Sequence, residues 1–217
     1  MGRTPKGPIA KYNESLSRDQ AIAKKVLTDS TITCLKGKAG TGKTRLAAVY
    51  ALEQYALGRK NGGIERIIIT RPPVFKKEHN IGFLPGDVSE KYSPWVTPLY
   101  EIVTDIEGVE GYEDLVKNKI LQIVPTMFIQ GRTFSNAVVI IDEAQNLTRE
   151  DITAFFTRLG RNSQMIFCGD TNQCIIDRKE SGFERLCEMS ALIDDINVYE
   201  LETNWRHPII ENLLEKY

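Results

Sequence analysis

The sequence predicts an α/β fold in which a parallel sheet carries helices on both faces. The chain has 217 residues, enough for one domain with a sizeable core. Five short runs rich in β-branched residues have the composition of buried strands, and helix-like stretches separate most of them. Strands that alternate with helices form βαβ units, whose strands pair in parallel. The runs lie at 31–35, 66–70, 137–142, 164–169 and 196–201.

The clearest helix is expected at 44–57, "TRLAAVYALEQYAL", directly after the first strand. It is followed by Gly58, and glycine is the residue type that most often ends a helix. The segment between strand and helix, "LKGKAGTGKT", holds lysines and small residues but almost nothing that fills a core. A bound group must therefore hold this segment in order.

This glycine-rich segment satisfies the pattern G-x-x-x-x-G-K-[ST], which is typical of a phosphate-binding P-loop. Glycines let backbone N–H groups turn inward at a helix N-terminus and surround an anion. Lys43 would reach the β- and γ-phosphates of a nucleotide, and the Thr44 hydroxyl would take a Mg²⁺ position. A chance match in a chain of this length has a probability on the order of one in a hundred. The expected nucleotide-binding residues are Gly37, Lys38, Ala39, Gly40, Thr41, Gly42, Lys43 and Thr44.

Two later strand ends carry polar side chains that suit the same site. The run "VVIIDEAQN" ends in Asp142, which would hold Mg²⁺, and Glu143, which would act as general base toward the attacking water. The run "FCGDTNQCII" places Asp170 and Gln173 at the carboxyl edge of the sheet, where ligands bind in open α/β folds. Gln173 would contact the γ-phosphate or the lytic water. The simpler alternative is a turn capped by Asp170.

The last predicted strand runs into "YELETNWRHPII". Arg206 is expected to offer a charge-assisted contact to a γ-phosphate. Trp205 offers a flat face for a base or for a protein neighbour, although a single tryptophan is more often part of a core.

In their order along the chain, these segments resemble the first motor domain of superfamily-one helicases. "SRDQAIAKKVL" carries Gln20 ahead of "GKAGTGKT", and "DEAQ", "GDTNQ" and "LETNWR" follow. In that superfamily the matching glutamine reads the adenine edge, and an aromatic–arginine pair stacks on the base and touches the γ-phosphate. The resemblance therefore implies that Gln20, Trp205 and Arg206 contact ATP, and it favours a stacking role for Trp205.

A closer resemblance is to the PhoH-like family of P-loop ATPases, from about Gln20 to Ile210. Its segments here are "IIITRPPV", "GFLPGDVSEKYSPWVTPLYE", "FIQGRTFSNAVVIIDEAQN", "TRLGRNSQMIFCGDTNQ" and "NWRHPII". The family implies one RecA-like domain that hydrolyses ATP, often assembles as a hexameric ring and is linked to RNA or single-stranded nucleic acid. We expect this domain at 13–217, after a loosely ordered N-terminus at 1–12.

Superfamily-one helicases supply a further arginine across the ATP from a second motor domain, which we do not find in this sequence. An arginine of this kind is worth roughly 10³ to 10⁵ in rate. We therefore expect a neighbouring subunit of a head-to-tail ring to supply one. The sequence leaves three candidates open: Arg132, Arg158 and Arg161.

An insertion is expected at about 72–105, because this stretch is too long and aperiodic for an ordinary loop. Its helical part is expected to run from Trp95 towards Asp105. Thr70 and Arg71, just before it, lie where related motors touch a nucleic-acid backbone, and both side chains suit phosphate oxygens. A salt bridge at the strand end is an equally weighted alternative.

Three aromatic residues of the insertion allow two interpretations. Tyr92, Trp95 and Tyr100 are either stacking platforms for bases or part of a subunit interface. Their proline-rich, amphipathic surroundings favour the interface.

Composition and charge limit the functional classes. The net charge of −1 does not indicate a simple DNA-binding module, although a ring can concentrate a few basic loops at one pore. We expect neither a secretory signal nor a membrane span. Four cysteines without CxxC spacing indicate free thiols in a cytoplasmic protein, with Cys34 and Cys168 inside buried strands.

The leading functional hypothesis is an ATP-hydrolysing ring that translocates on or unwinds single-stranded RNA or DNA, with ATP and Mg²⁺ as its cofactors. The alternative is an ATP-dependent switch or assembly protein without motor activity, which the low net charge keeps open. A small-molecule kinase is disfavoured, because the chain shows no arginine-rich lid and Glu143 suits the activation of water.

Overall fold

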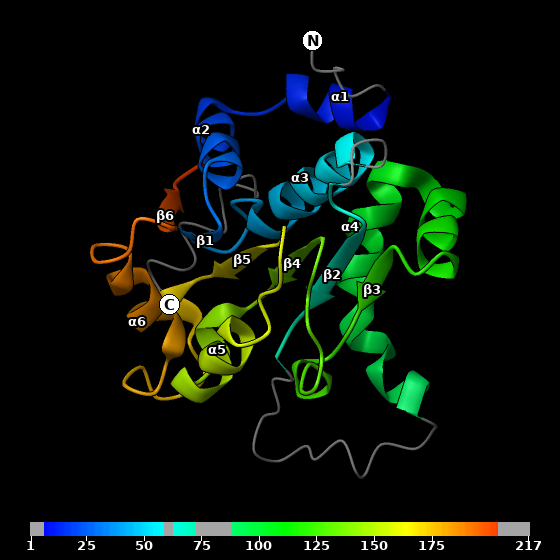
Figure 1. The fold of residues 1–217 in the computed structure, drawn as a ribbon. Coiled ribbons are helices and arrows are strands. Elements are labelled where there is room, and N and C mark those ends of the chain that lie inside the picture. The colour runs from blue at the N-terminus through cyan, green and yellow to red at the C-terminus, as the bar shows by residue number, and fades with distance from the viewer. Residues whose placement is uncertain (1–6, 59–62, 73–87, 204–217) are drawn as a thin grey trace, which may run out of the picture.

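The structure, a computed structural model, describes residues 7–58, 63–72 and 88–203, and within the helix that starts at Val88 it describes side chains from Thr97 onward. Its centre is a parallel sheet with the strand order β3-β2-β4-β5-β1-β6 (Figure 1). The predicted α/β fold is therefore confirmed. The strands are β1 Ile32–Gly37, β2 Arg66–Thr70, β3 Leu121–Ile123, β4 Ala137–Ile141, β5 Gln164–Gly169 and β6 Ile196–Leu201.

Helices cover both faces of this sheet (Figure 1). The α-helices are α1 Pro8–Glu14, α2 Arg18–Thr28, α3 Lys43–Gly58, α4 Val88–Lys117, α5 Arg149–Phe156 and α6 Gly182–Met189. Short 3₁₀ turns are η2 Thr126–Phe128, η3 Ala144–Asn146 and η4 Thr171–Gln173. Alternate strand residues face opposite sides, so Ile67 and Ile69 join a core with α1 to α4, whereas Ile68 joins a second core with α5 and α6.

The five strands expected from the sequence are all present, with bounds that differ by two residues at most. Strand β3 was missed because it has only three residues, which is too short for a periodic pattern. It pairs with β2 at the edge of the sheet. The predicted helix at 44–57 corresponds to α3 and ends at Gly58 as expected.

The helical part of the insertion is longer than predicted. Helix α4 begins at Val88 rather than Trp95 and continues to Lys117, with an interruption at Gly108, where φ is 76°. Prolines in the sequence argued against an earlier start. The buried stripe of Leu99, Val103 and Ile106 nevertheless packs this helix on the α3 side of the sheet. Residues 73–87 of the predicted insertion lie outside the described part.

The N-terminal segment also differs from expectation, because residues 8–12 belong to helix α1 instead of being loosely ordered. Pro8 suits the first turn of a helix, and the Ile9 side chain is buried in the core. Lys24 of α2 holds this helix in place: its Nζ lies 2.8 Å from Asn13 Oδ1 and 2.5 Å from Glu53 Oε2 of α3. The Lys24 and Glu53 side chains are 20% and 10% exposed, so this ion pair is shielded from solvent. Together with the hydrogen bond to Asn13 it ties α1, α2 and α3 together.

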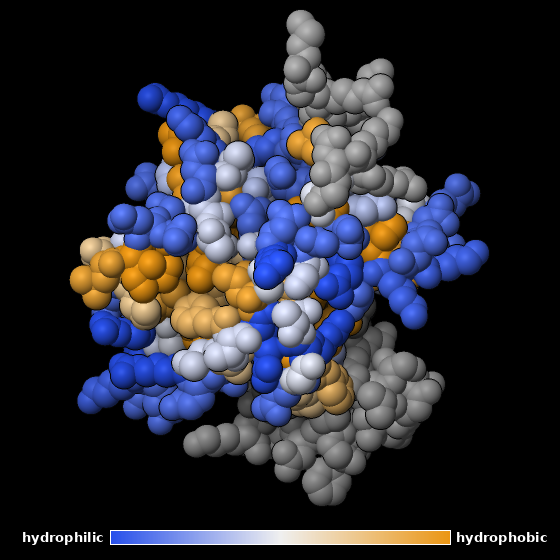
Figure 2. Space-filling model, in the orientation of Figure 1, coloured by the Kyte–Doolittle hydropathy of each residue, from blue (hydrophilic) through white to orange (hydrophobic). Residues whose placement is uncertain are grey.

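Figure 2 shows that hydrophilic side chains cover much of one face, and that an apolar cluster gathers at the left of the view, where α6 and the turn after it lie. Leu192 and Ile193 of this turn are exposed. Within the described ranges, no helix is both long and apolar enough to span a membrane. The four cysteines are free thiols, and Cys34 and Cys168 are buried in β1 and β5 as predicted.

Candidate nucleotide-binding and catalytic site

The loop between β1 and α3 has the backbone that the P-loop pattern predicts. Gly37, Gly40 and Gly42 have φ values of 146°, 90° and 82°, a region that side chains other than hydrogen strongly disfavour. A Cβ atom on Gly37 would lie 2.5 Å from the carbonyl oxygen of Leu201. The glycine therefore allows the end of β6 to pack directly against the start of the loop.

Lys43, the first residue of α3, folds back across this loop. Its Nζ donates to the carbonyl oxygens of Gly37 at 2.6 Å and Lys38 at 3.0 Å. The ammonium group is thus held beside the N-terminus of α3, where the helix dipole also favours an anion. The arrangement can bind phosphate.

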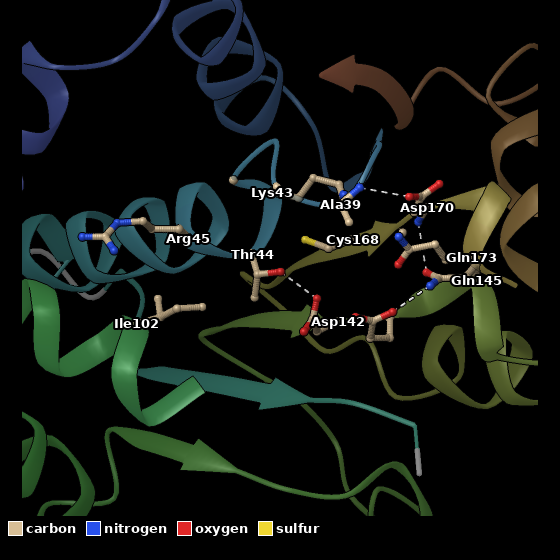
Figure 3. A pocket seen from close by; sticks show the side chains of 14 residues that line it. Ala39, Lys43, Thr44, Arg45, Ile102, Asp142, Gln145, Cys168, Asp170 and Gln173 are labelled. Carbon is tan, nitrogen blue, oxygen red and sulfur yellow. Dashed lines mark hydrogen bonds between the residues drawn. The ribbon is translucent and has the colours of Figure 1, made fainter. Parts of the chain in front are cut away.

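Thr44 and Asp142 meet, although 98 residues separate them in the sequence. The Thr44 hydroxyl donates to Asp142 Oδ1 at 2.6 Å (Figure 3). Burial raises the pKa of Asp142, and the hydrogen bond from Thr44 opposes this shift. A hydroxyl and one carboxylate at the mouth of a phosphate-binding loop fit Mg²⁺, which binds few protein oxygens and completes its shell with phosphate and water. In the described part of the chain, no three His, Cys, Asp or Glu residues gather as a metal site.

Glu143 lies at the end of β4 in a left-handed conformation, with φ 52° and ψ 38°. Both of its carboxylate oxygens have partners. Arg71 Nη2 lies 3.1 Å from Oε1, and Gln145 Nε2 donates to Oε2 at 2.7 Å. The same guanidinium reaches Asp142 Oδ2 at 3.9 Å. The strand-end salt bridge, one of two alternatives for Arg71, is therefore present.

Thr70 does not fit the contact with nucleic acid that the sequence predicts. Its side chain is fully buried at the end of β2, and its hydroxyl finds no hydrogen-bond partner among the described residues. A group with no solvent access cannot reach a polymer backbone, so this expectation is wrong for Thr70.

Gln145 links the strand ends and was not identified as a site residue from the sequence. Its side chain is 1% exposed, donates to Glu143 and accepts a hydrogen bond from the backbone N–H of Asp170 at 3.0 Å. Asp170 in turn accepts from the backbone N–H groups of Ala39 and Asn172, each at 3.0 Å. A continuous path of hydrogen bonds therefore joins Glu143 to the P-loop. In the sequence, the only feature that indicates this linking role is a glutamine after an apolar strand, because its amide is both a donor and an acceptor of hydrogen bonds.

One cleft of about 250 Å³ is lined by Thr44, Asp142, Glu143, Gln145 and Asp170 (Figure 3). Gln173 of η4 lines it together with Lys43 and Thr44, as the sequence predicts for a residue near a γ-phosphate. Asp170 also caps the turn that carries Gln173, which was the simpler interpretation of this segment. Arg45 and Ile102, which sequence patterns did not indicate, form part of the wall.

Gln20 lies beside the P-loop but is not part of the cleft wall. It forms a capping box with Ser17 at the start of α2, and its Nε2 would be 3.0 Å from a Cβ atom on Gly42. Trp205 and Arg206 lie outside the described residues. The strand end that precedes them is fixed by Asp19, whose carboxylate accepts from the N–H groups of Glu202 and Thr203 at 2.9 and 3.2 Å and from Tyr199 at 2.8 Å.

None of the three arginines proposed to act on a neighbour lines this cleft. The carbonyl oxygens of Arg158 and Arg161 accept hydrogen bonds from the backbone N–H groups of Phe134 and Asn136, just before β4. Both arginines therefore lie at the amino edge of the sheet, opposite the P-loop. The Arg132 guanidinium donates to Gln122 and lies 5.9 Å from the centre of the Phe134 ring.

Of the three insertion aromatics, only the Tyr100 side chain is described. Its ring packs edge-on against Tyr112 at a centroid distance of 4.8 Å. Tyr100 thus has a partner within its own helix, α4. Tyr92 and Trp95 belong to the part of α4 whose side chains are not described.

A parallel sheet with this loop between β1 and α3, and with carboxylates at the end of β4, defines a P-loop nucleoside-triphosphatase fold. The chain belongs to the PhoH-like protein family, which it matches over residues 14–217. It is 44% identical over 184 residues to a PhoH-like protein of Bacillus subtilis, covering 83% of this chain and 56% of the relative. It is 41% identical over 174 residues to the protein PhoH of Escherichia coli, covering 79% and 46%. The chain thus spans about half the length of these relatives.

Solved helicase structures share the fold. The Hef helicase domain of Pyrococcus furiosus superposes with a TM-score of 0.52 at 11% identity, covering 86% of this chain and 38% of that one. The helicase MrfA bound to DNA gives a TM-score of 0.51 at 12% identity, covering 92% and 30%. At this identity the likeness establishes the RecA-like fold and nothing finer.

Proposed function

We propose that this chain is a Mg²⁺-dependent ATPase and that it acts as one subunit of a ring-forming motor on single-stranded RNA or DNA. The observation that carries the proposal is the 2.6 Å hydrogen bond between Thr44 and Asp142. It joins the P-loop to a second strand end inside one cleft, which Lys43 and Glu143 also line. This is the set of oxygen, ammonium and carboxylate groups that phosphoryl transfer to water requires.

In the proposed reaction the P-loop N–H groups and Lys43 bind the β- and γ-phosphates. Mg²⁺ at Thr44 and Asp142 would neutralise charge on the phosphate oxygens. Glu143 accepts a proton from the water that attacks the γ-phosphorus, while the bond to the bridging oxygen breaks to leave ADP and inorganic phosphate. Gln173 is assigned to the γ-phosphate or the lytic water.

The remaining nucleotide contacts are proposed from the family resemblance. Gln20 is assigned to the adenine edge, and its side chain lies beside Gly42 of the P-loop. Trp205 is assigned to stacking on the base, and Arg206 to the γ-phosphate. Asp19 supports these assignments, because it ties the start of α2, next to Gln20, to the strand end that precedes the pair.

A ring is proposed because the arginine expected across the ATP is missing from the described lining of the cleft. Among these lining residues the arginine is Arg45, which belongs to α3, the helix that follows the P-loop. Arg158 and Arg161 at the amino edge are suited to a head-to-tail neighbour, because they lie far from the P-loop of their own subunit. The exposed apolar turn at Leu192 and Ile193 offers contact area for such a neighbour (Figure 2). Nucleic acid as the partner follows from the family resemblance, and we propose a cytoplasmic location from the free thiols.

The test is steady-state ATP hydrolysis over a range of protein concentrations, with and without single-stranded RNA and DNA. Lys43→Ala, which removes the phosphate-binding ammonium group, serves as the blank. Turnover that rises with protein concentration and again with one polymer supports the motor. Turnover that responds to neither favours the alternative, an ATP-dependent switch that acts on a protein partner.

A subunit-mixing experiment identifies the arginine that acts in trans. Arg158→Ala, Arg161→Ala and Arg132→Ala are each titrated into the wild-type protein. The trans arginine should lower activity more steeply than dilution, because one altered subunit disables its neighbour's site. Arg185→Ala is the matched control, since Arg185 is exposed on α6 and pairs with Glu188 of its own helix. Simple dilution by all the variants would rule out a site completed by these residues.

A further inference from the structure

Two thiols meet where helix α6 packs on the sheet, outside the nucleotide cleft, and the proposed function gives them no role. Cys34 is fully buried in β1, and Cys187 of α6 packs against the same core while it stays partly exposed. Their side chains are hydrogen-bonded to each other. One buried and one accessible sulfur therefore lie side by side.

The surroundings of Cys187 also place it over this part of β1. A pocket of about 440 Å³ has Cys187, Lys36 and Val198 in its wall. Lys36 follows Cys34 by two residues in β1, so the two side chains leave the strand on the same face. Val198 of β6 is the register partner of Cys34. Solvent therefore reaches Cys187 through this pocket, whereas Cys34 lies behind the pocket wall.

Cys187 has the charge environment of a reactive thiol. The hydrogen bond from Cys34 lowers the pKa of Cys187, burial opposes this, and the Lys36 ammonium group lowers the pKa further. The carboxylates of Glu184 and Glu200 raise it, but the net shift is downward. The same hydrogen bond raises the pKa of Cys34, so Cys34 is the donor and stays protonated. Because the thiolate is the nucleophilic form, Cys187 is the sulfur that reacts first.

The other cysteines show that partial exposure alone does not produce this character. Cys174 is also partly exposed, but its thiol donates to the carbonyl oxygens of Gln145 at 3.1 Å and Ile176 at 3.3 Å, and burial raises its pKa. Burial also raises the pKa of Cys168 inside β5. Of the four cysteines, Cys187 alone combines an accessible sulfur with a lowered pKa.

We propose that Cys187 and Cys34 form a peroxide-sensitive thiol pair, in which Cys187 attacks the oxidant and Cys34 resolves the product. The Cys187 thiolate attacks one oxygen of hydrogen peroxide. An S–O bond forms and the O–O bond breaks, so sulfur loses two electrons to become a sulfenic acid and the second oxygen leaves as hydroxide. The Cys34 sulfur then attacks the Cys187 sulfur. The S–S bond forms, and the sulfenic oxygen leaves as water with the proton of the Cys34 thiol.

The disulfide would join the strand that leads into the P-loop to a helix on the face of the sheet. Strand β1 ends at Gly37, and Phe183 of α6 packs so closely on Gly169 of β5 that a Cβ atom there would lie 2.5 Å from the ring. A disulfide bond is about 2.05 Å long, so the two sulfurs must approach from hydrogen-bonding contact and draw α6 towards β1. The inference does not depend on the proposed ATPase, because neither sulfur lines the cleft.

The first experiment measures alkylation by iodoacetamide at neutral pH, with each modified cysteine identified by mass spectrometry. In the folded wild type, Cys187 should react faster than Cys174, and in concentrated urea the two should react alike. Cys34→Ala removes the hydrogen-bond donor and should slow alkylation of Cys187 by about two- to fivefold, because less of the thiol is ionised. The rate at Cys174 should not change, so Cys174 is the internal control.

The second experiment maps the products of stoichiometric hydrogen peroxide by mass spectrometry. Wild type should give a Cys34–Cys187 disulfide that a dithiol reductant removes. Cys34→Ala should instead accumulate a sulfenic acid at Cys187, which dimedone traps. Cys187→Ser should form neither product. Cys174→Ser is the matched control and should form the disulfide as wild type does.

The outcomes decide each step of the inference. Faster alkylation of Cys174 than of Cys187 in the folded wild type would overturn the reactive thiol. A sulfenic acid that persists at Cys187 in wild type, or a disulfide that involves Cys174 instead, would overturn the pairing with Cys34. So would four thiols that all stay reduced in peroxide. These wild-type comparisons need no substitution, and they leave the proposed ATPase to its own test with Lys43→Ala.

Discussion

Gln145 offers the sharpest test of how the site is held together. Its amide makes two hydrogen bonds, to the Glu143 carboxylate and from the Asp170 backbone, in a position that is 1% exposed. Gln145→Leu keeps the volume of the side chain and removes both bonds. The loss measured for this variant is therefore a loss of hydrogen bonding and not of packing.

The expected cost follows from the burial of the two partners. Glu143 is partly exposed, so water can replace the amide there and the loss is about 1 kcal/mol. Asp170 is 6% exposed, and its unpaired N–H costs about 2 kcal/mol. The sum is about 3 kcal/mol, which for a domain of this size lowers the melting temperature by roughly 6 to 12 °C.

The effect on catalysis should be separate from the effect on stability. Without Gln145 the Glu143 carboxylate has no fixed direction, and kcat should fall by about tenfold to a hundredfold. Gln164→Leu is the matched control. Its amide accepts from Tyr50 and donates to the carbonyls of Leu27 and Ser30, at the opposite edge of the sheet. It should lose stability to a similar extent and keep its kcat.

The measurements are urea denaturation followed by circular dichroism and ATP turnover at temperatures where both variants are folded. A Gln145→Leu protein as stable as wild type would refute the hydrogen-bond path to Asp170. Equal kcat in Gln145→Leu and Gln164→Leu would show that the path stabilises the fold without orienting Glu143.

Three further predictions concern other parts of the site. Gly37→Ala should destabilise the fold by roughly 1–3 kcal/mol in urea titrations, because its Cβ would meet the Leu201 carbonyl at 2.5 Å. Gly131→Ala should cost less, because φ there is also positive, at 77°, but a Cβ would meet nothing within 4 Å. Thr44→Val should raise the Mg²⁺ concentration for half-maximal turnover about tenfold. Burial raises the pKa of Asp19, but its hydrogen bonds together outweigh burial and lower that pKa. A carboxylate whose pKa is lower in the folded state stabilises the fold above pH about 4, and this contribution is lost as the pH falls further. The difference in melting temperature between wild type and Asp19→Asn should therefore shrink between about pH 5 and pH 3.

The sequence predicts the parts of this molecule that are specified locally. Buried parallel strands are continuous apolar runs, so their positions are legible, and the P-loop is a contiguous pattern with a backbone requirement at its glycines. Strand β3 is three residues long and has no such pattern. Helix α1 depends on Ile9 and on the ion pair of Lys24 with Glu53, contacts between segments that no local pattern records.

The same limit applies to the site. Asp142, Glu143 and Gln173 were predicted as site residues because carboxylates and amides at strand ends are themselves the signal, and the structure places all three at one cleft. The partners of Arg71 were left open, because whether an arginine at a strand end meets carboxylates or solvent depends on the neighbouring strand. That neighbour is β4, which pairs with β2 and ends in Asp142 and Glu143.

The strand order also explains why Gln145 and not another residue connects the site. Strand β5 lies between β1 and β4, so the end of β5 separates the P-loop from the carboxylates that follow β4. Thr44 spans this gap from α3 to Asp142, above the sheet. At the level of the strand ends, the gap is spanned by Asp170 of β5's own end, which bonds Ala39 on one side and Gln145 on the other. Glu143, unlike Asp142, makes no direct hydrogen bond to the P-loop among the described residues, and the buried amide of Gln145 connects it to Asp170 without adding a charge.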